Sequence, residues 1–396
     1  MDPIRNPYAP GAGTQPPELA GRDELLRTID VALQRIRLGR AAKSILMVGL
    51  RGVGKTVLLD RMCQKAIAEG MSTLRIEAPE GRSLPGILAP QLRTALLKLS
   101  RSENAKDLAI RGLRAIAGLA KGLKVKYNDI EVGIDYESEP GLADNGDLEQ
   151  DLQALLELAG KAASKAETAL VLFIDELQYV KEEQLAALIT AMHRIAQANL
   201  PITLVGAGLP QLRGQMGNAK SYAERLFDFV EVGALDPQAA KGALQRPANN
   251  EGAGFSNEAL DEIIRETKGY PYFLQEWGKH VWNIAKESPI TLEDVKAATR
   301  ETIATLDESF FRVRLDRLTP FEKKYLRAMA ELGAGPHRSS DIANALGRKV
   351  TELGPHRNSL IVKGMIFSPS HGDTAFTVPL FDDFMKRSMP GDDWKL

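Results

Sequence analysis

The chain has 396 residues, of which 44% are hydrophobic and 26% charged, a balance that excludes wholesale disorder. Lys and Arg number 51 against 52 Asp and Glu, so the net charge of −1 excludes a histone-like or polybasic protein. A single cysteine excludes an intrachain disulfide, and no apolar run reaches the roughly 20 residues that span a bilayer. We therefore expect a cytoplasmic protein of two or three domains without a membrane partner.

The N-terminal half begins with an extended segment and then alternates between helix and strand patterns. Residues 1–20 are rich in Pro and Gly, which predicts an extended, frayed segment. Helical spacing predicts a helix over 23–37, and the continuous apolar run 44–49 predicts a strand buried on both faces. A helix over 56–68 and a strand over 72–78 continue this alternation, which is typical of an α/β sheet.

Residues 83–147 interrupt the alternation, and we interpret them as an insertion in the sheet domain. Their spacing predicts helices over 84–99 and 105–119. Alternating residues over 123–136, on both sides of Asn128-Asp129, predict a β-hairpin. Three lysines make one side of this hairpin basic, which indicates solvated charge more strongly than contact with DNA or a partner: Lys121, Lys124 and Lys126.

The alternation then resumes, and strand patterns disappear after residue 235. The predicted helices are 148–163 and 181–198, and the predicted strands are 169–175, 202–207 and 227–232. Beyond them only helices are predicted, over 237–244, 257–266, 272–286 and 292–306. The expected domains are therefore an ATPase-like sheet core over 21–235, a helical lid over 236–310 and a C-terminal domain over 311–396.

The C-terminal domain has the element order of a winged helix-turn-helix. Thr319-Pro320-Phe321-Glu322 forms a capping box with Pro at the first helical position, which marks a sharp helix start. Helices are predicted over 321–332, 340–346 and 355–363, followed by paired strands over 365–368 and 374–378. The third helix is predicted to contact double-stranded DNA through four side chains: His356, Arg357, Ser359 and Lys363. A solvated face, or a contact with a protein partner, is the alternative.

Residues 49–56 fit the pattern G-x-x-x-x-G-K-[ST] between a predicted strand and a predicted helix. Glycines let the backbone N–H groups of such a loop point at phosphate oxygens, at a helix N-terminus that favours negative charge. Lys55 would neutralise the β- and γ-phosphates, and the Thr56 hydroxyl would bind Mg²⁺. The predicted ligands are ATP and Mg²⁺, bound by Gly49, Gly52, Val53, Gly54, Lys55, Thr56 and Val57.

A second motif places two carboxylates at the end of a predicted buried strand, Asp175 and Glu176. Ligands of parallel sheets bind at the carboxyl ends of the strands. Asp175 would hold the metal, and Glu176 would polarise the attacking water. A helix N-cap is the simpler role for Asp175. No Asn-Lys-x-Asp guanine motif occurs, which favours ATP over GTP.

Together the motifs resemble those of P-loop ATPases of the AAA+/STAND assemblage, and the layout is closest to archaeal-type ATPases and origin-recognition initiators. In that family a segment like Gly21-Arg22 helps to enclose the adenine, and a Gly-x-Pro motif like Gly269-Tyr270-Pro271 packs near the base. The resemblance therefore adds Arg22, Tyr270 and Pro271 to the nucleotide site. It also implies a P-loop fold of three αβα layers around a parallel sheet, followed by a helical lid and a winged helix.

Departures from the family pattern predict slow hydrolysis. The strand over 202–208 resembles the first sensor strand, but it ends in Gly-Ala-Gly rather than in Asn or Thr. The resemblance places an arginine finger at Arg225, where a solvated helix-end cation is the alternative. Such a finger acts on the phosphate of a neighbouring subunit, which implies an ATP-dependent homo-oligomer.

The leading expectation is an ATPase that couples its nucleotide state to DNA association through the winged helix, as an initiator, loader or mobile-element factor. A STAND-type signalling switch with a protein partner is the first alternative. An ATP-binding scaffold that hydrolyses little is the second, because the sensor residues are unusual.

Overall fold

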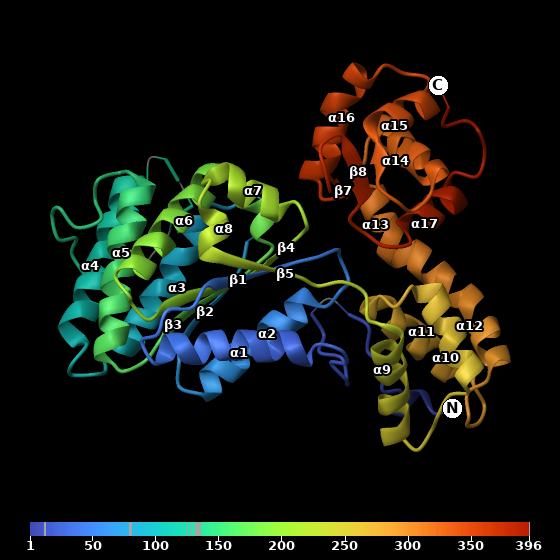
Figure 1. Cartoon of the computed structure of the whole chain (residues 1–396), viewed down its shortest axis with the longest axis horizontal. Helices are drawn as coiled ribbons and strands as arrows, with labels where there is room; N and C mark the ends of the chain where they lie inside the picture. The colour runs from blue at the N-terminus through green and yellow to red at the C-terminus, as the bar shows by residue number, and fades with distance from the viewer. Residues whose placement is uncertain (12, 79–80, 125, 128, 131–135, 396) are drawn as a thin grey trace. The chain divides into compact units, whose positions relative to one another are not determined.

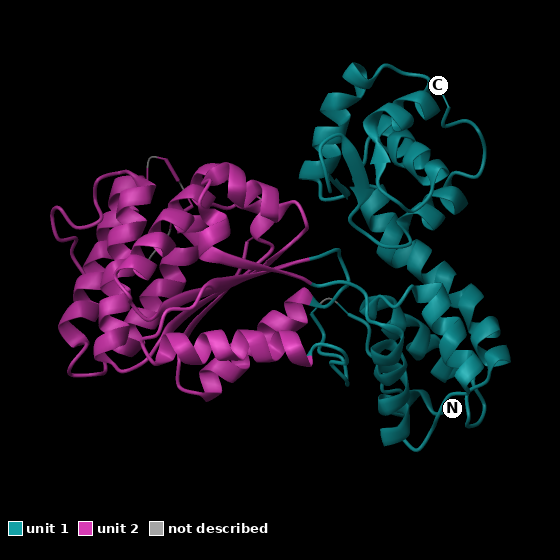
Figure 2. Ribbon diagram, in the orientation of Figure 1, with its two compact units in different colours: residues 1–22, 49–54, 232–396 teal, residues 23–48, 55–231 magenta. Residues whose placement is uncertain are grey.

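The computed structural model describes residues 1–11, 13–78, 81–124, 126–127, 129–130 and 136–395 (Figure 1). The chain divides into two compact units (Figure 2). Unit 1 contains residues 1–22, 49–54 and 232–396, and unit 2 contains residues 23–48 and 55–231. None of the described helices is long and apolar enough to cross a membrane.

Unit 2 is built on a five-stranded parallel sheet with the order β2-β3-β4-β1-β5. Its strands are β1 (Ser44–Val48), β2 (Ser72–Glu77), β3 (Leu170–Asp175), β4 (Ile202–Gly208) and β5 (Phe227–Glu231). Every residue of β1, β3 and β4 is buried, as their continuous apolar runs predicted. Because all pairs are parallel, the carboxyl ends of β1 and β3 lie at the same edge.

Helices cover both faces of this sheet, with α1 and α2 on one side and α5 and α6 on the other (Figure 1). The helices of unit 2 are α1 (Asp23–Arg37), α2 (Lys55–Ala68), α3 (Leu84–Leu99), α4 (Lys106–Leu123), α5 (Leu148–Lys165), α6 (Glu182–Gln197), α7 (Leu212–Ala219) and α8 (Ala223–Leu226). The predicted α/β core is therefore confirmed.

The inserted region differs from the expectation at the end of α4. A strand was expected from residue 123, but Leu123 is the last residue of the helix and is fully buried. It lies one turn after the buried Leu119, so the apolar face of the helix continues past the expected end at 119. Much of the expected hairpin, residues 125, 128 and 131–135, lies outside the described residues.

Unit 1 contains the lid helices and the C-terminal domain. The lid consists of α9 (Pro237–Asn250), α10 (Asn257–Thr267), α11 (Pro271–Ile284) and α12 (Leu292–Thr305), and a π-helical segment over Leu306–Phe311 leads into α13 (Arg312–Leu315). The C-terminal elements are α14 (Pro320–Leu332), β6 (His337–Arg338), α15 (Ser339–Leu346), α16 (Val350–Val362), β7 (Ile366–Phe367), β8 (Asp373–Phe376) and α17 (Phe381–Ser388).

The three short C-terminal strands form an antiparallel sheet with the order β6-β8-β7. The capping box that opens α14 is formed, with Thr319 and Glu322 as reciprocal partners. The helices and paired strands expected in this region are present, whereas their assignment as a winged helix stays a prediction.

The N-terminal segment is not frayed, contrary to the expectation from its Pro and Gly content. Tyr8 is 3% exposed and contacts the rings of Phe255 and Trp282, while its hydroxyl donates to the Leu244 carbonyl. The Trp282 indole N–H donates to the Asp2 carbonyl at 2.9 Å. The segment thus packs on the lid helices of unit 1, beside which the N-terminus lies (Figure 1). Burial of one aromatic ring outweighs the lack of regular structure around it.

Candidate nucleotide-binding site

The glycines of the loop 49–54 are required by its shape. A Cβ on Gly49 would lie 2.1 Å from the Val232 carbonyl oxygen, closer than any atom can approach. Gly52 and Gly54 have φ values of +78° and +92°, which residues with a Cβ rarely adopt. The loop therefore makes a tight turn at these glycines, as its sequence predicted.

Three segments distant in sequence hold this loop within unit 1. The Tyr272 N–H, in the first turn of α11, donates to the Gly52 carbonyl at 3.1 Å. Arg22 donates to the Val53 carbonyl at 3.3 Å and to the Gly233 carbonyl. The Arg51 N–H donates to the Thr377 carbonyl, beyond β8, at 2.9 Å. The N-terminal segment, the lid and the C-terminal domain thus each contact the loop.

Two of these contacts involve the segments that the family resemblance had selected. Arg22 is largely buried, and this burial lowers the pKa of its guanidinium while the nearby Asp236 opposes the shift. Tyr270 and Pro271 stand at the start of α11, immediately before Tyr272. The preceding Gly269 has φ +72°, and a Cβ there would lie 2.6 Å from the Leu235 carbonyl oxygen. The Gly-Tyr-Pro turn is therefore held against the beginning of the lid.

Lys55 and Thr56 open helix α2, directly after the loop, and Val57 follows them. Lys55 is 8% exposed although it is charged, which indicates that its ammonium is held for a specific contact. Its position at a helix N-terminus suits an anion. These residues of unit 2 have the local structure that the motif predicted.

Asp175 ends strand β3 and is 2% exposed. Its carboxylate accepts the N–H of Glu176 at 2.9 Å and lies 3.5 Å from a guanidinium nitrogen of Arg75. Arg75 also contacts Asp60 on α2 at 2.6 Å. The positive charge of Arg75 stabilises a buried carboxylate that is otherwise costly to desolvate.

Glu176 has a left-handed backbone, with φ +54°, and its carboxylate accepts a hydrogen bond from the Gln178 side-chain amide. The oxygen of the same amide accepts the N–H of Leu209, just after β4, at 3.0 Å. Gln178 is buried, and a Cβ on Gly208 would lie 2.8 Å from its amide oxygen. One amide therefore connects the expected catalytic acid to the end of the expected sensor strand.

Gln178 was not selected from the sequence, and it changes the interpretation of the sensor strand. Gly208, the last residue of the strand, leaves room for the amide of Gln178, whereas Gly206 leaves room for Leu177 and Leu46. A polar side chain is thus present at the end of β4, supplied by the 3-10 turn Leu177–Tyr179 instead of by the strand. The sequence signal that could have identified it is a glutamine two residues after Glu176, together with the Gly-Ala-Gly end of the next strand.

The residues present fit Mg²⁺ by their chemistry. The Thr56 hydroxyl and the Asp175 carboxylate supply the oxygen ligands that this ion prefers. Within the described ranges, no group of three or more His, Cys, Asp or Glu could enclose a metal ion. This suits an ion that takes most of its ligands from phosphate and water.

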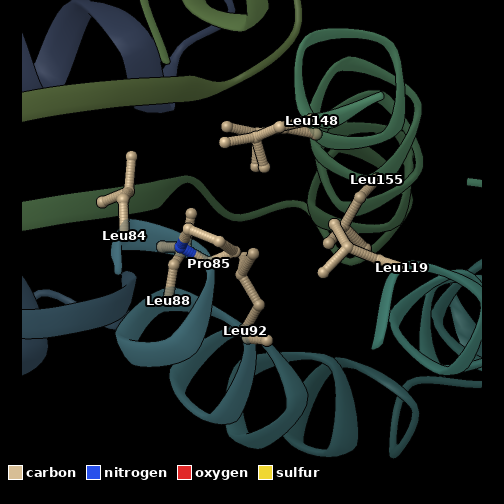
Figure 3. A pocket seen from close by; sticks show the side chains of 9 residues that line it. Leu84, Pro85, Leu88, Leu92, Leu119, Leu148 and Leu155 are labelled. Atoms are coloured by element: carbon tan, nitrogen blue, oxygen red, sulfur yellow. The ribbon is translucent and has the colours of Figure 1, made fainter. Parts of the chain in front are cut away.

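A small cavity lies elsewhere in unit 2. It measures about 10 Å³ and is lined by leucines and other apolar residues of α3, α4 and α5 (Figure 3). Leu88, Leu119 and Leu152 are among the residues that line it, and none of the motif residues contributes to its wall. This space is a small gap in the packing of the inserted helices and cannot hold a nucleotide.

Comparison with known proteins agrees with the site. The AAA ATPase domain family matches residues 18–205. Residues 18–205 are therefore similar to an AAA ATPase domain. Residues 308–385 match a domain of unknown function, DUF8462. No curated protein matches the chain.

The chain is similar to several solved structures, and the first of these has the same fold. A Walker-type ATPase of Pyrococcus abyssi has a TM-score of 0.57 at 17% identity, over 94% of this chain and 97% of that one. The Orc1 protein of Aeropyrum pernix, in complex with DNA, has a TM-score of 0.46 at 16% identity, over 95% and 94% of the two chains. RuvB of Thermotoga maritima has a TM-score of 0.45 at 17% identity, over 90% and 93%.

Arg225 lies after the region that matches the AAA ATPase domain, in the short helix α8 before the edge strand β5. Its side chain is exposed, and no hydrogen bond or ion pair of this side chain occurs among the described residues. A trans-acting finger needs such exposure, so the arginine-finger assignment remains a proposal.

The four residues expected to contact DNA have partners inside the C-terminal domain. Arg357 donates to the Thr374 hydroxyl and to the Ser368 hydroxyl, both at 2.9 Å, which ties α16 to the β7–β8 pair. His356 stacks on Phe321, with ring centroids 4.2 Å apart. Ser359 and Lys363 both bind the carboxylate of Glu322, as described next. Much of the hydrogen-bonding capacity of these side chains is therefore used inside the domain.

Glu322 is the centre of a buried ion pair in this domain. Its carboxylate accepts from the Ser359 hydroxyl at 2.7 Å, from the Lys363 ammonium at 2.7 and 2.9 Å, and from the Thr319 N–H at 2.7 Å. Burial by itself raises the pKa of Glu322, but these donors outweigh it and lower the pKa from 4.5 to about 2. The negative charge thus stabilises the folded domain.

We expect the removal of Gln178 to impair hydrolysis without weakening ATP binding. Gln178→Leu keeps the volume of the side chain but releases Glu176, so kcat for ATP should fall by about 10- to 100-fold. Steady-state hydrolysis and equilibrium binding of a fluorescent ATP analogue would separate the two effects. Gln215→Leu is the control, because its amide donates only to the Gln178 carbonyl. A Gln178→Leu variant with the wild-type kcat would show that Glu176 is oriented by other groups.

We expect the ion pair of Glu322 to make the domain sensitive to acid. Because the pKa is depressed on folding, its contribution is complete above pH 4.5 and is lost as the pH falls towards 2. The full contribution is about 3 kcal/mol. Urea unfolding of wild type and Glu322→Gln at pH 7 and pH 3 measures it. The advantage of the wild type should shrink at pH 3, and an equal advantage at both pH values would contradict the assignment.

Proposed function

We propose that this chain binds ATP with Mg²⁺, hydrolyses it slowly to ADP and phosphate, and couples its nucleotide state to association with double-stranded DNA. The observation that supports hydrolysis is the pair of carboxylates at the end of β3, of which Asp175 is buried and Glu176 is held by an amide. A nucleotide-binding protein without hydrolysis has no need to orient a second acid.

In this mechanism the backbone of the loop 49–54 and the ammonium of Lys55 bind the phosphates of ATP. Thr56 and Asp175 would hold Mg²⁺, which supplies charge neutralisation at the phosphates. Glu176 accepts a proton from water as the water oxygen attacks the γ-phosphorus and the bond to the bridging oxygen breaks. Gln178 holds the Glu176 carboxylate in the orientation that the attack requires.

The loop contacts of unit 1 supply a route from the nucleotide to the C-terminal domain. Backbone groups of three loop residues form hydrogen bonds with other segments: the N–H of Arg51 and the carbonyls of Gly52 and Val53. A phosphate bound in the loop would compete for these hydrogen bonds or change their geometry. It would thereby weaken or strengthen the contacts of the loop with α11 and with Thr377. A ligand shifts such an equilibrium by its difference in affinity for the two states.

A STAND-type switch that acts on a protein partner is a second candidate. It is favoured by the hydrogen bond from the Arg51 N–H to the Thr377 carbonyl, which ties the C-terminal domain to the phosphate loop. It is also favoured by the internal bonds of Arg357 and Lys363, which occupy the cations expected to bind phosphates. DNA and protein partners therefore give different outcomes in the experiments that follow.

The primary test is the ATPase rate with and without double-stranded DNA, at low and moderate salt. Salt-sensitive stimulation by DNA supports DNA coupling, because phosphate contacts weaken as salt rises. A slow rate that is indifferent to DNA would favour the protein-directed switch. Replacement of Arg357 and Lys363 by Ala then tests whether α16 contributes to any DNA effect.

Two substitutions test the nucleotide site itself. Lys55→Ala should lose ATP affinity, because the phosphates lose their cation. Glu176→Gln should bind ATP as the wild type does but hydrolyse it about 10²- to 10⁴-fold more slowly, the usual contribution of a general base. Equilibrium binding and phosphate release measure the two properties. Unchanged ATP affinity in Lys55→Ala, or near-normal turnover in Glu176→Gln, would contradict the assigned role.

We also propose an ATP-dependent homo-oligomer in which Arg225 acts on the nucleotide of a neighbouring subunit. Arg225→Ala should reduce turnover without changing ATP affinity. Mixing it with Lys55→Ala subunits should restore activity, because a mixed interface joins an intact finger to an intact loop. Phosphate release from the mixture measures this restoration. If the mixture stays as inactive as the separate variants, Arg225 does not act in trans.

A further inference from the structure

The inserted helices hold a concentration of positive charge that the folding of unit 2 does not require. Residues 82–126 contain ten Lys or Arg, whereas the only acids among them are Glu103 and Asp107. This segment thus has a net charge of +8 within a chain of net charge −1. Like charges gathered on one surface repel one another and destabilise a fold unless a partner neutralises them.

The cations of α4 lie on its solvent face. Arg111, Arg114, Lys121 and Lys124 are exposed and are spaced by three or seven residues, so they recur on one side of a helix of 3.6 residues per turn. The opposite side packs into the core through Leu113, Ile116 and other buried residues. From Arg111 to Lys124 the helix advances about 20 Å. Lys98, Arg101 and Lys106 extend this basic surface at the turn between α3 and α4; we call the seven residues the α3–α4 basic face.

Most of this charge is not neutralised within unit 2. Arg111 and Arg114 share one carboxylate, Glu139, at 3.0 and 3.7 Å. The other five cations of the α3–α4 basic face, Lys98, Arg101, Lys106, Lys121 and Lys124, form no ion pair within the part of the chain that the structure describes. By contrast, Arg357 and Lys363 of α16 are bound inside their own domain. The exposed positive charge that could bind a polyanion is therefore on the α3–α4 basic face.

The surroundings of these cations narrow the class of partner. Among the described residues of 82–126 there is no exposed large hydrophobic side chain, which a membrane-binding helix would need. The segment also contains no aromatic residue, and the ring of Tyr127, which follows it, is buried. Single-stranded nucleic acids are bound largely by stacking on such rings. A row of cations about 20 Å long, without apolar or aromatic groups, suits the phosphates of a duplex.

We propose that the α3–α4 basic face binds the phosphate backbone of double-stranded DNA. This inference builds on the proposed DNA association and assigns it a surface other than α16. The contact is made through charge, so it fixes the position of the ATPase domain on the duplex without selecting a base sequence. Each Lys or Arg that neutralises a phosphate releases counterions and contributes about 0.9 to the dependence of log K on log salt.

The test is DNA affinity as a function of KCl concentration, measured by fluorescence anisotropy with a labelled duplex and the full chain. The variant Arg101→Gln, Lys121→Gln, Lys124→Gln should weaken binding at least about tenfold near 0.1 M salt and lower the salt slope by about 2 to 3. Lys98→Gln, Lys106→Gln is a second, independent variant and should lower the slope by up to about 2. The matched control replaces Arg27, Arg37 and Arg40 by Gln, because these are exposed cations of the same unit without ion pairs among the described residues.

The outcomes separate this inference from the proposed function. If the wild type binds DNA and both α3–α4 variants keep its affinity and slope, the inference is overturned and DNA association by α16 remains. Equal losses in the control variant, or competition by polyglutamate as strong as that by DNA, would also overturn it. A wild type that binds no DNA overturns both, whereas DNA binding through α3–α4 without measurable ATP hydrolysis leaves the inference intact and removes the ATPase proposal.

Discussion

The close approach of Gly49 to the Val232 carbonyl is the constraint on which the candidate site depends. With 2.1 Å between that oxygen and the position of a Cβ, only glycine allows the loop to follow β1 in this path. The loop can then present its carbonyls and N–H groups to Arg22, Tyr272 and Thr377. A loop that is fixed by its neighbours is preorganised for phosphates, and it transmits any change in its shape to the segments that hold it.

A second consequence concerns the division of roles at the sheet edge. Asp175 is buried and paired with Arg75, whereas Glu176 is turned away by its left-handed backbone and held by Gln178. Two adjacent acids thus have different surroundings, as the separate tasks proposed for them, metal binding and proton transfer, require. Because Gln178 also binds the end of β4, a displacement of that strand would reach Glu176 through one amide.

The two surfaces on which a negatively charged partner could bind differ in whether their cations are already bound within the protein. In the C-terminal domain, Lys363 neutralises the buried Glu322, and Arg357 fastens α16 to the paired strands. These cations contribute to stability, and removal of Lys363 from Glu322 would leave a buried carboxylate without its counter-charge, at high cost. On α3–α4 the cations lie on a solvent face and are matched by few acids. Their interaction with a polyanion requires no rearrangement of the fold.

The sequence by itself determined the α/β core, the lid helices, the phosphate loop and the carboxylates Asp175 and Glu176, because these follow from local spacing: apolar runs, helical periodicity and glycines before a Lys-Thr pair. It did not determine the continuation of α4 through Leu123, the burial of Tyr8 or the bond between Gln178 and Glu176. Each of these joins residues through side-chain packing or a hydrogen bond that periodicity does not encode. Only the tertiary structure decided which cations are bound internally and which remain at the surface, because the partner of Lys363 lies 41 residues away in the chain.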